Sequence, residues 1–212
     1  VSEIIEDKVP VGKIFDVGAA TGYFLDIAKT RNWDTSGIDI SEYASSVSRQ
    51  KGHNAYAGRL KDVDVEGSYD VVTMWDVFEH VEDPGNYMKK TNRILTPGGM
   101  VAVNTIDKNS MWAKVMGKRW HLIIPPEHIF FYSKKSLKKL FEDNGFEILQ
   151  IRKIGKKFAL PYIFKMLYHW QRLSVWNSLY NICAKNQYLR KLSIPINLRD
   201  NIFILARKIK DV

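Results

Sequence analysis

The chain has 212 residues, of which 45% are hydrophobic and 12% aromatic. This composition excludes a disordered chain and predicts a globular protein with one sizeable core and room for a small appendage. The single cysteine, Cys183, excludes an intrachain disulfide, and no apolar run reaches the roughly 18 residues of a membrane-spanning helix.

The net charge of +9 is unevenly distributed along the chain. Residues 1–154 contain 21 basic and 21 acidic residues, whereas residues 155–212 contain 11 basic and 2 acidic residues. The asymmetry predicts that the C-terminal part has an acidic partner. The three alternatives are an anionic lipid, a phosphorylated substrate and a nucleic acid.

The first ten residues, VSEIIEDKVP, lack the basic and then apolar pattern of a secretory signal. We therefore expect a cytoplasmic protein, and a single cysteine is consistent with a reducing compartment. Because the first residue is Val rather than Met, we also expect that residues upstream have been removed.

The segment from Lys13 to Asp39 predicts a binding site for an adenosine-type cofactor. An apolar strand runs into a turn of small residues, Gly18 to Gly22, and a helix follows at once. Such a turn brings backbone N–H groups close to a ligand. A second strand ends on Asp39, where a carboxylate can accept hydrogen bonds from ribose hydroxyls. The alternative is a tight turn in which Gly18 and Gly22 serve backbone geometry only.

The details of the turn select among cofactors. In the dinucleotide fingerprint G-x-G-x-x-G/A the third position must be small, but here it is Tyr23, which disfavours nicotinamide and flavin dinucleotides. The pattern acidic-x-G-x-G-x-G fits Asp16, Gly18, Ala20 and Gly22, with Ala in place of the middle Gly. This pattern resembles the first motif of class I S-adenosylmethionine-dependent methyltransferases.

Strand and helix patterns alternate five times in the first half of the chain. After the helix that begins at Tyr23, we expect a helix capped by Ser41, strands over 53–59 and 69–75, a helix over 84–95, a turn over 96–99 and a strand over 100–104. This order is typical of a parallel sheet with helices on both faces, where ligands bind at the carboxyl ends of the strands.

A second motif lies in the string from Tyr69 to Pro84, YDVVTMWDVFEHVEDP. It closely resembles the fourth motif of small-molecule methyltransferases related to the ubiquinone-biosynthesis O-methyltransferases. Together the motifs cover residues 13 to about 154. The resemblance implies a Rossmann-like α/β fold with a seven-stranded, mostly parallel sheet. It also implies methyl transfer from S-adenosyl-L-methionine, with S-adenosyl-L-homocysteine as product, to a small-molecule or lipid- or sugar-linked acceptor, most often at oxygen.

The same resemblance implies roles for particular residues. The glycine turn would hold the amino-acid tail of the cofactor, Asp39 the ribose and Trp75 the methionyl region, and the loop after the third strand would contact adenine. The residues assigned to the cofactor are Asp16, Gly18, Ala20, Gly22, Tyr23, Asp39, Ile40, Leu60 and Trp75.

Three histidines are candidates for a catalytic base, which helps when the acceptor is a hydroxyl that must lose its proton. His128, in the string EHIFFYS, matches a position where related enzymes often carry histidine near the acceptor, and the further candidates are His80 and His121. The alternative for each is a histidine that only stabilises the structure.

Asp76, Glu79 and His80 also allow a Mg²⁺ interpretation, because some related enzymes carry an E-x-x-E-H string linked to a divalent ion. Aspartate replaces the first glutamate here, and acidic residues at helix starts are common for reasons of the helix dipole alone. We therefore assign no metal ligands.

The second half of the chain predicts short elements and one insertion. We expect a helix near 111–116, a helix capped by Ser133 that ends at Asn144, strands over 147–154 and 201–209, and helices over 156–200. The domains would be a cofactor-binding core over 1–154, a basic and aromatic helical cap over 155–200 inserted between the last two strands, and the final strand over 201–212.

The insertion has three interpretations. It could be a cap whose apolar face covers the cleft, a peripheral contact with an anionic membrane, or, least favoured, a nucleic-acid site, since no RNA-binding signature accompanies the charge.

Two other functional classes stay open. One is a nucleotide-dependent oxidoreductase or epimerase, which would require a small residue in place of Tyr23. The other is a non-catalytic cofactor-binding module of the same fold. Two departures from the family pattern leave room for it: Ala20 replaces the middle glycine, and Arg59 stands where the family commonly has an acidic residue in the loop after the third strand.

Overall fold

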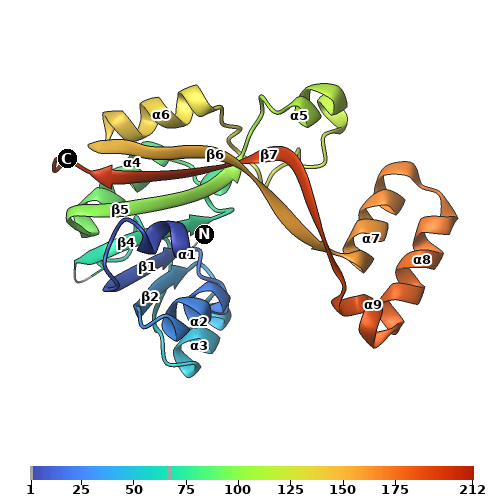
Figure 1. Cartoon of the computed structure of the whole chain (residues 1–212), viewed down its shortest axis with the longest axis horizontal. Coiled ribbons are helices and arrows are strands. Elements are labelled where there is room, and N and C mark those ends of the chain that lie inside the picture. The colour runs from blue at the N-terminus through green and yellow to red at the C-terminus, as the bar shows by residue number, and fades with distance from the viewer. Residues whose placement is uncertain (1, 66–67) are drawn as a thin grey trace. The chain divides into compact units, whose positions relative to one another are not determined.

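The computed structural model describes residues 2–65 and 68–212, without the side chains of residues 2, 3, 156 and 157 (Figure 1). The chain forms two compact units. The first comprises residues 1–153 and 200–212 and contains the body of the sheet. The second comprises residues 154–199 and contains three helices.

A seven-stranded sheet forms the centre of the first unit, in the order β3-β2-β1-β4-β5-β7-β6. The pairs β3–β2, β2–β1, β1–β4 and β4–β5 are parallel, and β7 runs antiparallel to β5. This confirms the predicted seven-stranded, mostly parallel sheet. The strands are β1 (Lys13–Val17), β2 (Asp34–Asp39), β3 (Asn54–Ala57), β4 (Tyr69–Trp75), β5 (Leu95–Ile106), β6 (Phe146–Ala159) and β7 (Ser193–Lys208).

The helices that follow β1, β2 and β4 connect these strands to the next ones and pack on the sheet (Figure 1). Two helix caps are those that the sequence predicts: Ser41 accepts a hydrogen bond from the backbone N–H of Ala44, and Ser133 forms a capping box with Ser136. The helices of this unit are α1 (Ser2–Glu6), α2 (Tyr23–Thr30), α3 (Glu42–Gln50), α4 (Pro84–Ile94), α5 (Met111–Met116) and α6 (Lys134–Asp143), with single 3₁₀ turns at Phe78–His80 and Gly117–Arg119.

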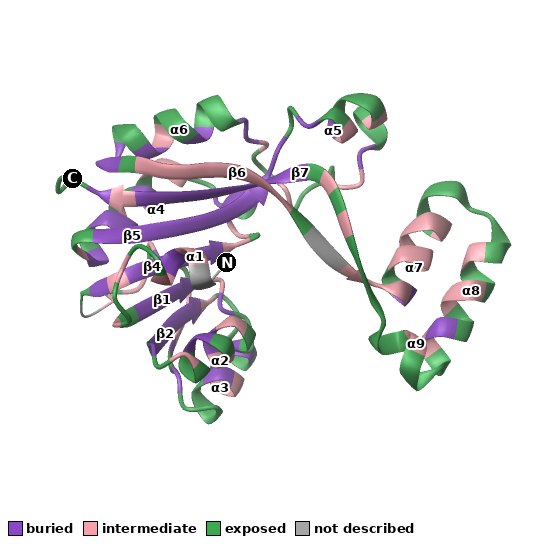
Figure 2. Cartoon of the chain, in the orientation of Figure 1, coloured by how far each residue is buried: buried purple, intermediate pink, exposed green. Residues whose placement is uncertain are grey.

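The core lies between the sheet and these helices, as the purple interior of Figure 2 shows. Phe15 and Val72 on the central strands are fully buried and belong to the same hydrophobic cluster as Met88 of α4 and Phe141 of α6. Burial on both faces explains why the central strands are continuous apolar runs rather than alternating ones.

Two regions differ from the expected pattern. The TPGG segment over 96–99 belongs to β5 rather than to a free turn. Leu95 already pairs with Tyr69, and the register then shifts so that Met100 pairs with Val71. Between these two pairs, four residues of β5 lie opposite a single residue of β4. Gly98, one of the four, has a positive φ of 76°.

The last two strands are also longer than expected. β6 continues to Ala159 and β7 begins at Ser193, so that both extend into the second unit. The sequence does not indicate this extension, because Gly155 and Pro195 lie in it and both residue types are uncommon inside strands. Since the two strands are neighbours in the sheet, they can satisfy each other's backbone groups there.

The second unit contains α7 (Leu160–Gln171), α8 (Ser174–Lys185) and α9 (Gln187–Lys191). In the described parts of the chain, no helix combines the length and the hydrophobicity that crossing a membrane requires.

Candidate functional site

A cavity of about 360 Å³ lies at the carboxyl ends of β1, β2 and β4. Parallel α/β sheets bind ligands at this edge, and the volume is in the range of small-molecule sites. The cavity is lined by Val17, Gly18, Ile38, Asp39, Ile40, Gly58, Arg59, Leu60, Lys61, Trp75, Asp76, Val77, His80, Val81, Glu82, Asp83 and Tyr87.

The small-residue turn after β1 contributes its first residue, Gly18, to the lining of this cavity. The backbone N–H groups of Gly18 and Ala19 donate to the carbonyl oxygen of Ile38, at 2.8 and 3.0 Å, and thereby fix the turn on β2. Gly18 has a φ of +77°, and a Cβ atom on it would lie 2.2 Å from Cγ2 of Val77. Glycine is therefore required at this position both by backbone conformation and by space.

Asp39 joins the turn to the end of β2. One carboxylate oxygen accepts a hydrogen bond from the backbone N–H of Ala20, and the other accepts one from that of Ser41, both at 2.9 Å. The side chain is half-buried and lines the cavity. Because each carboxylate oxygen can accept a second hydrogen bond, Asp39 keeps capacity for the hydroxyls of a ligand.

Asp16, the acidic residue of the first motif, is only 2% exposed and lies outside the group of described residues that line the cavity. Its Oδ1 accepts a hydrogen bond from Oγ1 of Thr73 on β4, at 2.5 Å. Burial raises the pKa of Asp16 to about 8, and the negative charge of Asp39 adds to the shift. The side chain thus links β1 to β4 beneath the turn.

This raised pKa predicts a pH-dependent stability. The carboxyl group has its ordinary pKa of 3.8 in the unfolded chain, but stays protonated to about pH 8 when folded. The folded state therefore binds the extra proton between these values, so the free energy of unfolding should fall as pH rises through this window, by at most ~1.4 kcal/mol per pH unit. Urea unfolding of Asp16→Asn should lack this slope. If the free energy of unfolding of Asp16→Asn had the same pH dependence as that of the natural chain, the raised pKa of Asp16 would be contradicted.

Ala20 occupies the middle glycine position of the motif with a φ of +45°. An L-residue with a side chain is strained in this region by roughly 1 kcal/mol. We expect Ala20→Gly to raise the free energy of unfolding by about that amount, as measured by thermal unfolding. The matched control is Ala19→Gly, which should destabilise, because Ala19 is buried and has no such strain to relieve.

The other predicted cofactor residues fall into two groups. Ile40, Leu60 and Trp75 line the cavity, with Leu60 fully buried and Ile40 76% exposed. Gly22 is buried at the start of α2, whereas Tyr23 is 75% exposed, and both lie outside the set of described lining residues.

The indole ring of Trp75 is held between two aromatic rings, those of Phe24 at 5.0 Å and Phe203 at 6.4 Å between centroids. Its Nε1 atom is buried and has no hydrogen-bond partner among the described residues. A buried donor of this kind is costly unless a ligand or water satisfies it.

Charged residues at the rim of the cavity were not predicted. Glu82 lies 3.5 Å from Arg59 and 3.2 Å from Lys61, measured between charged atoms, and all three line the cavity. The sequence did contain a signal for this contact, since opposite charges follow two strands of the same sheet and the carboxyl ends of parallel strands share one edge.

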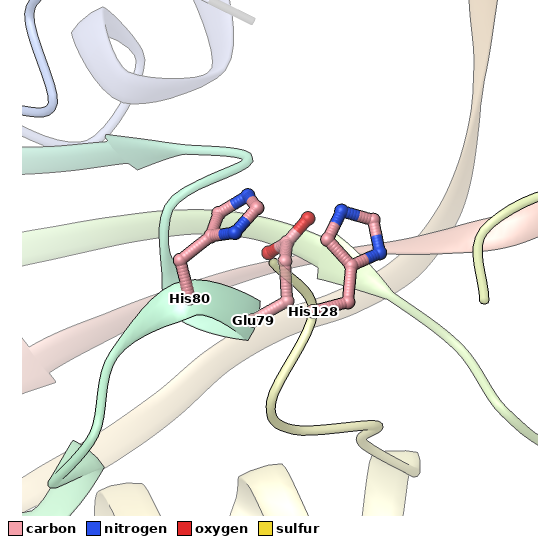
Figure 3. Close-up of side chains that lie close together, drawn as sticks. All are labelled: Glu79, His80 and His128. Carbon is pink, nitrogen blue, oxygen red and sulfur yellow. The ribbon is translucent and has the colours of Figure 1, made fainter. Parts of the chain in front are cut away.

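The second group of chemically active side chains consists of Glu79, His80 and His128, shown in Figure 3. One potential ligand atom from each lies within 4.8 Å of the others. Glu79 and His80 come from the 3₁₀ turn after β4, whereas His128 comes from the loop before α6. This loop is fixed by Glu79, whose carbonyl oxygen accepts hydrogen bonds from the backbone N–H groups of Ile129 and Phe130.

Backbone carbonyls determine the tautomers of both histidines. His80 Nδ1 lies 2.7 Å from the carbonyl oxygen of Glu127, and His128 Nδ1 lies 2.6 Å from that of Leu122. A carbonyl oxygen only accepts, so each Nδ1 must carry the hydrogen. In the neutral rings Nε2 is therefore left as the basic atom.

Glu79 is 2% exposed, and its Oε2 accepts a hydrogen bond from Oγ1 of Thr105 at 2.7 Å. Burial raises the pKa of this carboxyl group above its usual value, which the hydrogen bond from Thr105 partly offsets. A buried carboxylate beside two imidazole rings would stabilise positive charge on either of them.

The remaining candidates lie apart from this group. His121 is half-buried with Nε2 3.8 Å from Oδ2 of Asp200, and it does not belong to the three-residue cluster found among the described residues. Asp76 is likewise outside the cluster, has a φ of +55° and accepts a hydrogen bond from Asn104 at 2.7 Å. The Mg²⁺ interpretation thus changes, because the structure groups Glu79 and His80 with His128 rather than with Asp76.

The sequence matches the family described as "Methyltransferase domain" over residues 1–151. It is 29% identical over 133 residues to the ubiquinone biosynthesis O-methyltransferase of Acinetobacter baylyi, covering 58% of this chain and 56% of that protein. The corresponding enzyme of Thiobacillus denitrificans is 29% identical over 144 residues, covering 61% of each. The chain thus spans somewhat more than half the length of these relatives.

Solved structures share the fold over nearly the whole chain. A SAM-dependent methyltransferase from Thermotoga maritima superposes with a TM-score of 0.62 at 19% identity, covering 97% of this chain and 86% of that one. Phosphoethanolamine N-methyltransferase 2 of Haemonchus contortus, solved with S-adenosyl-L-methionine, gives 0.62 at 16% identity, covering 99% of this chain and 52% of that one.

The fold is thus that of the class I S-adenosylmethionine-dependent methyltransferases. The chain belongs to the methyltransferase-domain family. This membership disfavours the oxidoreductase and epimerase alternatives, as the bulky Tyr23 already did.

Proposed function

We propose that the protein transfers a methyl group from S-adenosyl-L-methionine to an oxygen atom of a small-molecule or lipid- or sugar-linked acceptor, leaving S-adenosyl-L-homocysteine. The observation that carries this proposal is one cavity that has Gly18 and Asp39 in its wall and also includes His80, whose ring contacts that of His128.

The cofactor would be held by residues around the ends of the first strands. Asp39 would accept hydrogen bonds from the ribose hydroxyls, Ile40 and Leu60 would contact the adenine, and backbone N–H groups of the Gly18–Gly22 turn would bind the amino-acid tail. Trp75 would lie beside the methionyl part, where its unsatisfied Nε1 could find a partner. When bound, the cofactor supplies a methyl group on a positively charged sulfur.

The protein's own contribution to the reaction is positioning and proton removal. Holding an acceptor oxygen in line with the methyl group requires no covalent step by the enzyme. A hydroxyl acceptor must also lose its proton, and Nε2 of His128 is the base that we assign to this task. His80 would orient the acceptor, and the carboxylate of Glu79 would stabilise the imidazolium formed on His128.

The same three side chains also fit a divalent cation. Two imidazole nitrogens and one carboxylate oxygen are a common ligand set, and both rings already donate their other N–H to a backbone carbonyl, as metal-binding histidines do. A cation held by Glu79, His80 and His128 would lower the pKa of an acceptor hydroxyl. A chelator separates the two roles, because it should abolish transfer only if a cation is required.

The test of the proposed function has two stages. Isothermal titration calorimetry of the folded chain with S-adenosyl-L-homocysteine should show binding at one site, and the absence of heat would contradict the proposal. Labelled S-adenosyl-L-methionine and a cell extract should then yield a labelled product, whose resistance to alkaline hydrolysis distinguishes a methyl ether from a methyl ester. Binding without any transfer would identify a non-catalytic module instead.

A further inference from the structure

The helical unit of residues 154–199 has almost no core of its own. Among its described side chains only Pro161 and Cys183 are buried. Figure 2 shows α7, α8 and α9 mostly in the colours of exposed and intermediate residues. Ring contacts between Phe164 and Trp176, at 6.2 Å between centroids, hold α7 against α8. Much of the apolar surface of this unit is therefore left open.

The charge of this unit is entirely positive. Residues 154–199 contain eight lysine and arginine residues and no aspartate or glutamate, whereas the rest of the chain contains 24 basic and 23 acidic residues. Eight of the nine net positive charges thus belong to the helical unit. Because it has no carboxylate side chain, its cations cannot be neutralised within it, and they create a positive field that attracts anions.

Large apolar side chains are exposed on the same surfaces as these cations. On α8, Val175 and Ile182 are 51% and 59% exposed and share a face with Lys185, at helical spacing. On α7, the half-exposed Tyr162 shares a face with Lys165. The exposed large apolar residues of the unit are Tyr162, Trp170, Leu173, Val175, Ile182, Tyr188, Leu192 and Ile194.

We propose that residues 154–199 dock on the surface of an anionic lipid bilayer. Aliphatic and aromatic side chains would enter the boundary between headgroups and acyl chains, while the cations would contact lipid phosphates. The two longest helices of this unit, α7 and α8, have 12 residues each. A helix of this length extends ~18 Å, which is less than the ~30 Å of a hydrocarbon core. The unit therefore lies on the bilayer and does not cross it.

Two other occupants fit the surface less well. A second copy of the chain would bring two uniformly positive units together, which electrostatic repulsion opposes. A single-stranded nucleic acid would use the cations and the aromatic rings, but would leave Val175, Ile182 and Leu173 exposed, since bases stack on aromatic rings and not on aliphatic side chains. Docking on a bilayer uses all three kinds of side chain, and it does not depend on the proposed methyl transfer.

The experiment is co-sedimentation of the full chain with vesicles of phosphatidylcholine, alone or mixed with phosphatidylglycerol. We expect binding only to the anionic vesicles, weakened by salt. Each cation near such a surface contributes about fivefold, so Lys165→Gln, Arg172→Gln and Lys185→Gln together should weaken binding roughly 100-fold. The matched control is Lys89→Gln, Lys134→Gln and Lys135→Gln, which removes the same charge from exposed positions of the first unit and should bind like the natural chain.

A second variant separates lipid insertion from electrostatic attraction alone. Val175→Ser with Ile182→Ser keeps every charge and should weaken vesicle binding by roughly tenfold for each lost side chain. Thermal unfolding and S-adenosyl-L-homocysteine titration show whether each variant is folded. Equal binding to both vesicle types, or binding by the triple-glutamine variant as tight as that of its control, would overturn the proposal. So would binding to a single-stranded oligonucleotide without any binding to anionic vesicles.

Discussion

Replacing His128 by alanine should lower the rate of methyl transfer to a hydroxyl acceptor by about 100- to 10,000-fold, the usual contribution of a general base. His128 Nδ1 is held by the carbonyl of Leu122, so Nε2 is the atom that can take the proton. Affinity for S-adenosyl-L-homocysteine should stay unchanged, because His128 is not among the described residues that line the cavity in which we propose the cofactor binds. Single-turnover assays with labelled cofactor measure the rate, and calorimetry measures the affinity.

The control for this prediction is His121→Ala, which removes another half-buried imidazole outside the cluster and should affect the rate only weakly. If a chelator abolishes transfer and added divalent metal restores it, the cluster holds a cation. A His128→Ala variant with the natural rate would exclude His128 from either role.

Replacing Asp39 by alanine should weaken binding of S-adenosyl-L-homocysteine by at least tenfold. Removing an acceptor of a charge-assisted hydrogen bond costs ~1.5–3 kcal/mol, and Asp39 would serve two ribose hydroxyls. The side chain also accepts hydrogen bonds from the backbone N–H groups of Ala20 and Ser41, so its loss should destabilise the turn after β1 as well. Calorimetric titration measures the effect directly.

Asp34→Ala is the matched control, since Asp34 is an exposed aspartate at the opposite end of the same strand. This variant should bind the ligand with the affinity of the natural chain. Asp39→Asn keeps one acceptor oxygen and should fall between the two. Thermal unfolding separates loss of binding from loss of structure. Natural affinity in a folded Asp39→Ala variant would show that the carboxylate does not bind the ribose.

Local signals in the sequence predicted most of the first unit correctly. The apolar run of Tyr69–Trp75 has the bounds of β4, Ser41 and Ser133 cap the helices that they were expected to cap, and Asn144 ends α6. These features depend on neighbours within a few residues. The extensions of β6 and β7 were missed because pairing between segments distant in sequence overrides the local effect of Gly155 and Pro195.

The sequence by itself determined the family, the sheet and one wall of the cavity. The spacing from the glycine turn to Asp39 follows from one strand, one helix and the next strand, so a short stretch contains all the information needed. The tertiary structure alone decided which histidines meet. His80 and His128 are 48 positions apart, and their rings are brought together by hydrogen bonds between the loop and the turn after β4, from Ile129 and Phe130 to Glu79 and from His80 to Glu127. It also decided that Asp16 is buried and Tyr23 exposed, because burial depends on how distant elements pack and not on the motif in which a residue stands.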